Sequence, residues 1–283
     1  MTKNQLLELI QQLFSTCPGN TIAPEDALLP ELSGARIFES PLVCVAAADD
    51  PLYIKLKDES VVGPWHMNPE EWLPGAKAVV SLFFPFTEII KADQRKIPDR
   101  TSPAWLHGRI EGQSYLVSFT AALCDMLRRQ GISCCAPCTD PRFQYVMSGE
   151  TAFPGYPDKG EAVFGSNWSE RHTAYISGLG TFGLSRGIIT EKGMAGRLTS
   201  VIVDLPLEPT VRPYTCLYDY CIFCGVCALR CPVDAISEED GKDHVPCGRR
   251  LAHSKKVYAP RYGCGSCQTS VPCESRNPSA KKN

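Results

Sequence analysis

Three long apolar runs dominate the first three quarters of the chain. They read LVCVAAA over 42–48, AVVSLFF over 78–84 and LTSVIVDL over 198–205, and a proline directly follows each of the last two. Continuous apolar runs of this length are typical of strands that are buried on both faces. The pattern therefore predicts a central sheet.

Helical periodicity predicts the elements around these strands. Residues 1–14 form an amphipathic pattern without the continuous apolar core of a signal peptide. A second helix is predicted over 115–130, with Gly131 as its C-cap. A shorter helix is predicted to begin after Ser169 and to end at Gly178.

The pattern divides the chain into two domains. Residues 1–210 carry the predicted strands and helices and are expected to form an α+β layer domain. The stretch 153–165 is rich in proline and glycine and is predicted to be a long loop within it. Residues 211–283 are rich in cysteine and poor in apolar runs, which is typical of a segment ordered by metal.

Composition narrows the class of protein. The 283 residues have a formal net charge of -2, so the chain as a whole has no electrostatic footprint for nucleic acid. No run approaches the roughly 18 apolar residues of a membrane span. The 15 cysteines would form disulfides in a secreted protein, but the N-terminal helix favours a cytoplasmic location, where clustered cysteines usually hold metal.

One cysteine run has a specific spacing. Residues 221–232 read CIFCGVCALRCP, the C-x2-C-x2-C-x3-C-P order of bacterial ferredoxins. The first three thiolates would wrap one cubane, and the fourth, Cys231, would ligate the other cluster. A short helix is predicted to start at Val233–Ile236. Structural zinc is disfavoured because zinc sites use paired C-x2-C knuckles.

A second set of cysteines predicts a second [4Fe-4S] cluster. By the crossed ligation of two-cluster ferredoxins, one cluster takes Cys221, Cys224, Cys227 and Cys273, and the other takes Cys231, Cys247, Cys264 and Cys267. Which remote cysteine completes each cluster stays open, because the spacing before Cys273 departs from the simple motif and no proline follows it.

The remaining cysteines are interpreted as ordinary thiols. Cys134, Cys135 and Cys138 suggest a third metal site, but small buried thiols on an apolar strand explain them better. Cys216 lies five residues before Cys221 and is a spare ligand or, by preference, a bystander.

Residues 169–184, which read SERHTAYISGLGTFGL, resemble the epoxyqueuosine reductase family. In that family a Glu-Arg pair precedes a helix that ends in Ala-Gly-Leu-Gly, followed by a glycine-rich loop. The resemblance continues through 187–190, through 201–207 and through the cysteine module, and Pro74-Gly75-Ala76 looks like the family's turn into a strand.

The resemblance implies a fold and a redox function. This family and the related reductive dehalogenases carry two [4Fe-4S] clusters beside a cobalamin on a nitroreductase-like sheet domain. It implies a nitroreductase-like mixed sheet flanked by helices, and an iron–sulfur oxidoreductase that passes electrons to a corrinoid or a small substrate. The implied donor is a ferredoxin or flavodoxin. The alternatives are an electron-transfer or corrinoid-reducing protein without an organic substrate and a cluster-bearing interaction subunit.

The same segment supplies candidate cofactor contacts, namely Arg171, His172, Gly178, Gly180 and Gly183. The glycine spacing is similar to a dinucleotide fingerprint, but a helix precedes these glycines where the fingerprint needs a strand. Close backbone approach to a flat cofactor fits better, and helix capping at Gly178 fits nearly as well.

The chain departs from the family at its catalytic aspartate. The family carries an Arg-Asp-Tyr-His stretch, whereas residues 109–115 here read RIEGQSY without an aspartate. Glu111 and Tyr115 are the candidate proton donors, and the alternative for Glu111 is an exposed glutamate at a helix start.

Transfer RNA is not the expected substrate. The chain has 29 basic and 31 acidic residues, its basic cluster over 249–261 is small, and it ends ten residues after Cys273, where the family continues into a helical region that helps to hold tRNA. We expect a small-molecule or protein-bound substrate near 169–183, and a solvated face or a docking surface for an acidic electron donor at the basic cluster.

Overall fold

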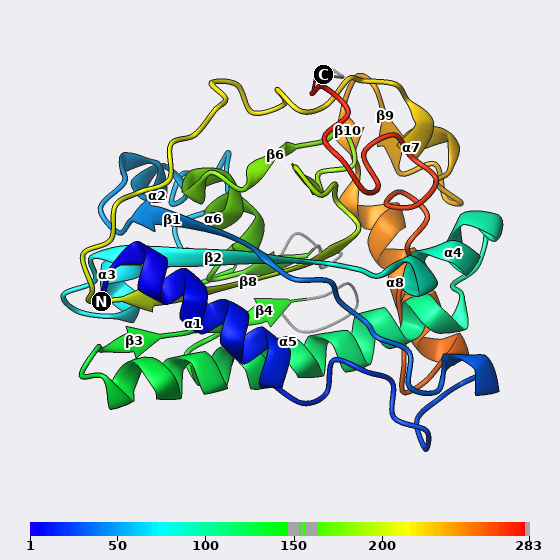
Figure 1. The fold of residues 1–283 in the computed structure, drawn as a ribbon. Coiled ribbons are helices and arrows are strands. Elements are labelled where there is room, and N and C mark those ends of the chain that lie inside the picture. The colour runs from blue at the N-terminus through cyan, green and yellow to red at the C-terminus, as the bar shows by residue number, and fades with distance from the viewer. Residues whose placement is uncertain (147–152, 154, 157–163, 281–283) are drawn as a thin grey trace.

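A four-stranded sheet forms the centre of the molecule (Figure 1). The computed structural model describes residues 1–146, 153, 155–156 and 164–280. The strands lie in the order β1 (Leu42–Ala47), β2 (Ala78–Pro85), β8 (Gly196–Val203) and β3 (Cys134–Cys135). The three strands predicted from the apolar runs are therefore confirmed, and β2 is buried along its whole length.

The expectation of a mixed sheet is wrong for the described strands. Each described neighbour pair of the central sheet is antiparallel. Ala47, at the end of β1, pairs with Ala78, at the start of β2, so the connecting segment leaves and re-enters at the same end of the sheet. A connection of that kind makes neighbouring strands antiparallel. The nitroreductase-like classification stays a prediction.

Helices cover both faces of the sheet. Figure 1 shows α1 (Lys3–Thr16) and α5 (Pro103–Arg129) against one face, and α6 (Glu170–Ser177) packs against β1, β2 and β8 from the other. Side chains alternate along β2, so Val80 and Phe84 join the core under α1 and α5, whereas Val79 and Phe83 face the α6 side.

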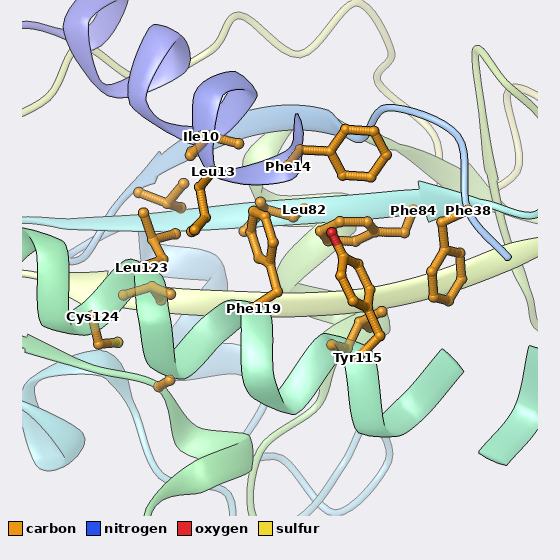
Figure 2. Packing of buried hydrophobic residues seen from close by; sticks show 14 of the residues in the cluster. Ile10, Leu13, Phe14, Phe38, Leu82, Phe84, Tyr115, Phe119, Leu123 and Cys124 are labelled. Atoms are coloured by element: carbon orange, nitrogen blue, oxygen red, sulfur yellow. The ribbon is translucent and has the colours of Figure 1, made fainter. Parts of the chain in front are cut away.

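Aromatic rings fill the core between α5 and the sheet (Figure 2). Phe84 meets Phe119 edge to face at 5.1 Å between ring centroids and Tyr115 at 6.1 Å. Phe38 stacks on Phe86 at 5.2 Å. Rings of this size bury much apolar area, so this core supplies most of the order of the domain.

Helix α5 begins twelve residues earlier than predicted. Ser102 caps it through Trp105 N–H, and Pro103 occupies the first turn, where it is tolerated. Two glycines lie in the part of the helix that was not predicted. A Cβ at Gly108 would lie 2.8 Å from Ile90, and one at Gly112 would lie 2.9 Å from the Phe38 ring. These glycines allow close packing, so they do not end the helix.

Shorter elements connect the layers. The predicted helix after Ser169 is confirmed as α6, and Gly178 ends it in the left-handed conformation with φ 97°. The loop predicted over 153–165 lies mostly outside the described residues. The remaining elements of residues 1–210 are α2 (Pro51–Lys55), α3 (Pro69–Trp72), α4 (Glu88–Lys96), the short helices η1 (Pro30–Leu32) and η2 (Pro137–Thr139), and the paired strands β4 (Tyr145–Val146) with β5 (Gly165–Ser166) and β6 (Gly180–Phe182) with β7 (Ile188–Thr190).

The cysteine-rich part carries little regular structure. It contains α7 (Val226–Leu229), the hairpin of β9 (Ile236–Ser237) and β10 (Gly241–Lys242), and α8 (His244–Val257). The helix predicted at Val233–Ile236 is wrong. Asp234 has φ 49°, outside the helical region, and the helical turn precedes Cys231 instead of following it.

Polar contacts join this part to α4 and α5. Arg95 binds the carboxylates of Glu274 and Glu88, and Lys91 donates to the Ser275 hydroxyl at 2.8 Å. Arg230 donates to the Arg95 carbonyl on α4 at 3.1 Å, and Arg261 pairs with Glu111 on α5. These contacts fix the cysteine-rich part at one end of the sheet, as Figure 1 shows. No helix in the described ranges combines the length and the apolarity needed to cross a bilayer.

Candidate iron–sulfur centres and the adjoining cavity

Four cysteines gather in one pocket. Cys221, Cys224, Cys227 and Cys273 all line it, together with Gly183. The first three come from the loop before and within α7, where Gly225 is in the left-handed conformation at φ 69°, and Cys273 comes from the C-terminal loops. The pocket is small, about 20 Å³. Its donor set of four thiols, and not its volume, matches a cluster.

Three further cysteines line a second cavity. Cys247 on α8 meets Cys264 and Cys267 of the following loop around a space of about 300 Å³. Trp105 and Arg197 also line this space, so it lies between the sheet domain and the cysteine-rich part.

Cys231 lies with the second group. The pKa of the Cys267 thiol is raised, first by burial and then by neighbouring thiols that include Cys231. The two groups also approach each other. Burial raises the pKa of the Cys227 thiol to about 11, and the next contribution comes from the neighbouring thiol of Cys267. The described geometry thus brings seven of the eight predicted ligands to two pockets and places Cys231 near Cys267, while the crossed assignment of the two ligand sets stays a prediction.

The surroundings of these thiols suit clusters. Ala235 N–H donates to Cys231 Sγ at 3.2 Å, the kind of bond that stabilises a ligating thiolate. Among the residues that the structure describes, no three His, Cys, Asp or Glu side chains are grouped closely enough to hold one metal ion. In a cubane each thiolate binds a different iron, so its ligands stand farther apart than those of a single ion.

The other cysteines lie apart from these groups. Cys134 and Cys135 form β3 and are buried, which confirms their interpretation as small strand thiols. Cys124 is buried on α5, and Cys138 is half-buried with Sγ 3.4 Å from the Thr199 hydroxyl. Cys216 is exposed at the surface.

A larger cavity adjoins the second one. It measures about 700 Å³ and shares Phe164, Arg171 and His244 with the cysteine-lined space. Trp65 and Trp168 contribute aromatic walls. A volume of this size is within the roughly 300–1,000 Å³ that is common for small-molecule sites.

Two of the predicted cofactor contacts line the cavities. Arg171 borders both spaces, and His172 borders the larger one. His172 Nδ1 lies 2.7 Å from the Ser169 hydroxyl, and its ring lies against Phe182 at 5.0 Å. Burial, followed by the charge of Arg171, lowers the pKa of His172 to about 4, so the imidazole is neutral at pH 7.

The three predicted glycines have other local roles. Gly178 caps α6, in agreement with the alternative. A Cβ at Gly180 would lie 1.9 Å from the carbonyl oxygen of Ile189, so pairing of β6 with β7 requires this glycine. Gly183 lines the pocket of the first cysteine group.

The predicted proton donors lie away from both cavities. Glu111 is within α5, not at its start, and pairs with Arg261 and with buried His107. Burial favours a raised pKa for Glu111, but these two partners outweigh it and lower the pKa. Tyr115 is 2% exposed within the aromatic core, where burial raises the pKa of its phenol. Neither residue lines a described cavity.

Several cavity residues escaped prediction. Arg109 on α5, Arg197 on β8 and Lys242 on β10 line the cysteine-lined cavity. Glu170 lines the larger one, and burial raises the pKa of its carboxyl to about 7. These residues are scattered along the chain, and only the Glu170–Arg171 pair stood in a recognised motif.

Comparisons with known proteins identify part of the chain. Residues 217–237 match the model of the 4Fe-4S binding domain. The chain therefore contains an iron–sulfur binding segment there. No curated protein matches the sequence significantly.

Solved structures similar to the chain include the two groups named by the sequence resemblance. An epoxyqueuosine reductase from Streptococcus thermophilus is 16% identical over 82% of this chain and 62% of that chain, with a TM-score of 0.47. An epoxyqueuosine reductase solved with an epoxyqueuosine-modified tRNA stem loop is 16% identical over 95% and 66%, with a TM-score of 0.49. A B12-dependent reductive dehalogenase is 18% identical over 96% and 37%, with a TM-score of 0.47. The chain thus spans less than two thirds of the length of these proteins' chains.

Proposed function

We propose that this chain is an iron–sulfur reductase. In this proposal two [4Fe-4S] clusters pass electrons to an acceptor in the cavities between the sheet domain and the cysteine-rich part. The observation that carries it is the lining of the second cavity, which combines Cys247, Cys264 and Cys267 with Trp105 and Arg197 of the sheet domain. An acceptor in that space would lie directly beside a cluster.

The solvent exposure of the residues around the first cluster supports a direction for electron transfer. Cys224 is exposed, and Ile222 and Phe223 beside it are 48% and 49% exposed. The first cluster is therefore the proposed entry point for electrons from a ferredoxin or flavodoxin. The proximity of Cys227 to Cys267 supports transfer from the first cluster to the second.

The chain's residues have distinct parts in this proposal. The eight thiolates would hold the clusters, and the Ala235 N–H would stabilise the Cys231 sulfur. Trp65, Trp168 and Phe164 would exclude water from a flat acceptor. The clusters would supply single electrons, and their potentials would depend on sulfur hydrogen bonds and on burial.

Cobalamin is the proposed resident acceptor. The aromatic walls and the two adjoining spaces, about 300 Å³ and about 700 Å³, suit a flat macrocycle, and Arg171 and His172 would line its site. A corrinoid would supply a metal that accepts electrons from the second cluster. An organic substrate would then be small or carried on a protein, and tRNA is not part of the proposal.

A second candidate is an electron-transfer protein without its own organic substrate. The exposure of Cys224 and of its apolar neighbours favours it, because a surface cluster exchanges electrons readily with a second protein. The two candidates differ in whether the cavities receive an acceptor.

Anaerobic reconstitution tests the proposal. We expect the reduced, cluster-loaded protein to be oxidised when hydroxocobalamin is added and to retain the corrinoid after gel filtration. Cys231→Ala should lose this transfer, and Cys138→Ala is the matched control that should keep it. Clusters that load and reduce but transfer no electrons to any cavity-bound acceptor would favour the second candidate.

A further inference from the structure

Three guanidinium groups converge on the cysteine-lined cavity. Arg109 comes from α5, Arg171 from α6 and Arg197 from β8, and all three line the space of about 300 Å³. Their elements are distant in sequence, so the fold assembles this group of cations. Lys242 from β10 lines the same space.

These arginines differ from the others that the structure describes at domain contacts. Arg95 binds Glu274, and Arg212 binds Asp50. Within the described ranges, by contrast, no acidic side chain forms an ion pair with Arg109, Arg171 or Arg197.

The partners they do have are neutral. Arg109 stacks on the Tyr262 ring at 4.5 Å and donates to its hydroxyl. Arg197 donates to the Gln113 side-chain carbonyl, and its buried Nε has no hydrogen-bond partner among the described residues. Burial, followed by the nearby charge of Arg109, holds the pKa of Arg197 well below its usual range.

A buried guanidinium without an anion is costly. Charges taken from water are usually paired, and removing the partner of a buried charge is strongly destabilising. The fold nevertheless brings half-buried Arg197, whose Nε is buried without a partner among the described residues, and half-buried Arg109 to one cavity wall. A bound anion at this wall would supply the missing partner.

The second cluster accounts for only part of this charge. An oxidised [4Fe-4S] core with four thiolates carries two negative charges, and Lys242 and Arg171 are cations that lie close to two of its predicted ligands. Lys242 donates to Cys247, and Arg171 lies close to Cys267 and Cys247. Arg197 and Arg109 remain without a negative partner.

We propose that Arg197 and Arg109 bind an oxoanion group of the acceptor, either a carboxylate or a phosphate. The planar guanidinium fork matches both groups with two parallel hydrogen bonds. This inference rests on the proposed function for the identity of the site, and it assigns the acceptor to organic anions. The bound group would lie beside the second cluster, within reach of its electrons.

Anion binding tests this assignment without turnover. Oxidised, cluster-loaded protein is titrated anaerobically with benzoate and with inorganic phosphate in a calorimeter. Arg197→Gln should weaken binding of the preferred anion about tenfold to a hundredfold, the effect of losing a charged hydrogen bond. Arg197→Lys should retain part of the affinity. Arg129→Gln, at an exposed position at the end of α5, is the matched control and should bind as the parent does.

Titration with two corrinoids shows whether the oxoanion belongs to the corrinoid or to the substrate. Cobalamin carries a phosphate in its nucleotide loop, and cobinamide does not carry that loop. If the corrinoid supplies the anion, Arg197→Gln should weaken cobalamin binding and leave cobinamide binding unchanged. If the substrate supplies the anion, each corrinoid should bind Arg197→Gln as tightly as it binds the parent protein. Benzoate or phosphate should bind the variant more weakly than the parent.

Clear outcomes would overturn the inference. Failure of the parent protein to bind either anion or cobalamin would do so, as would unchanged affinities in Arg197→Gln. Arg109→Gln provides a second test if the first variant loses its iron. Anion binding without electron transfer would remove the proposed function and keep the anion site. Electron transfer to a neutral acceptor, without anion binding, would keep the proposed function and remove the anion site.

Discussion

The sheet domain and the cysteine-rich part are ordered by different interactions. The sheet domain packs Phe84, Phe119 and their neighbours between α5 and β2, with exposed fractions near zero. The cysteine-rich part buries few large apolar side chains and exposes Leu229 to 87%. Its order comes from cysteine-lined pockets and from polar contacts with α4. We therefore predict that the sheet domain folds by apolar burial and that the cysteine-rich part needs its clusters for its order.

The largest expected effect concerns the cluster ligands. Cys231→Ala and Cys273→Ala should each remove half of the iron or more, because each residue would complete a cluster and binding energy is folding energy in such a segment. Iron and sulfide per chain are measured after anaerobic reconstitution. Cys134→Ala is the control, and loss of iron from it would break the distinction between ligands and strand thiols.

A core substitution tests the other side of the comparison. Phe119→Ala should lower the free energy of unfolding of the sheet domain by about 3–5 kcal/mol, through lost transfer energy and a cavity. Val117→Ala on the same helix, at a residue that is 38% exposed, should change it by less than about 0.5 kcal/mol. Urea titration followed by circular dichroism measures both, and equal effects of the two variants would contradict the packing described for α5.

The contact between the two regions should have an intermediate effect. Glu274→Gln removes a carboxylate that is 8% exposed and binds Arg95. We expect a loss of about 1–3 kcal/mol, less than for a fully buried pair because Arg95 is 33% exposed. Faster release of iron to a chelator would show that this contact holds the cysteine-rich part in place.

Glu88→Gln is the matched control for this contact. Glu88 binds the same arginine but is 65% exposed, so its loss should cost less than about 1 kcal/mol. If the two variants released iron at the same rate, the difference in burial would not matter and the account of this contact would be wrong.

The smallest expected effect is a pH dependence of the sheet domain. Burial, followed by the charge of His172, lowers the pKa of His66 to about 3. A depressed histidine pKa gives stability that is present above the unfolded value near 6.5 and is lost as pH falls. His66→Phe should therefore remove about 1 kcal/mol of the stability loss between pH 6.5 and 5.5, measured by thermal unfolding. If the stability of the parent protein and of His66→Phe fell equally with pH, His66 would not be a buried neutral imidazole.

The sequence predicts elements that depend on local patterns, and it does not predict features that depend on packing between residues distant in the chain. The three strands, α6 and its Gly178 cap were predicted correctly because apolar runs and caps are local signals. The start of α5 was missed. Its first part contains Gly108 and Gly112, whose place in a helix is explained by the room they make for Ile90 and Phe38. Such a reason exists only in the packed structure.

The candidate site shows the same difference between local motifs and residues brought together by the fold. The ferredoxin run is a local motif, and its first three cysteines line one pocket with Cys273, while the complete ligand sets stay a prediction. Glu111 and Tyr115 were proposed as proton donors from their sequence neighbourhood, but the fold places them in an ion pair and in the core. Arg109 and Arg197 carry no motif, and only the assembled cavity brings them together.

The central claim is that two clusters adjoin the cavities, and iron analysis with spectroscopy tests it most directly. Anaerobically reconstituted protein should contain about eight iron and eight sulfide per chain. Its reduced form should show the magnetic signature of two interacting [4Fe-4S] clusters in electron paramagnetic resonance. A content near four iron per chain, or zinc in place of iron, would contradict the account.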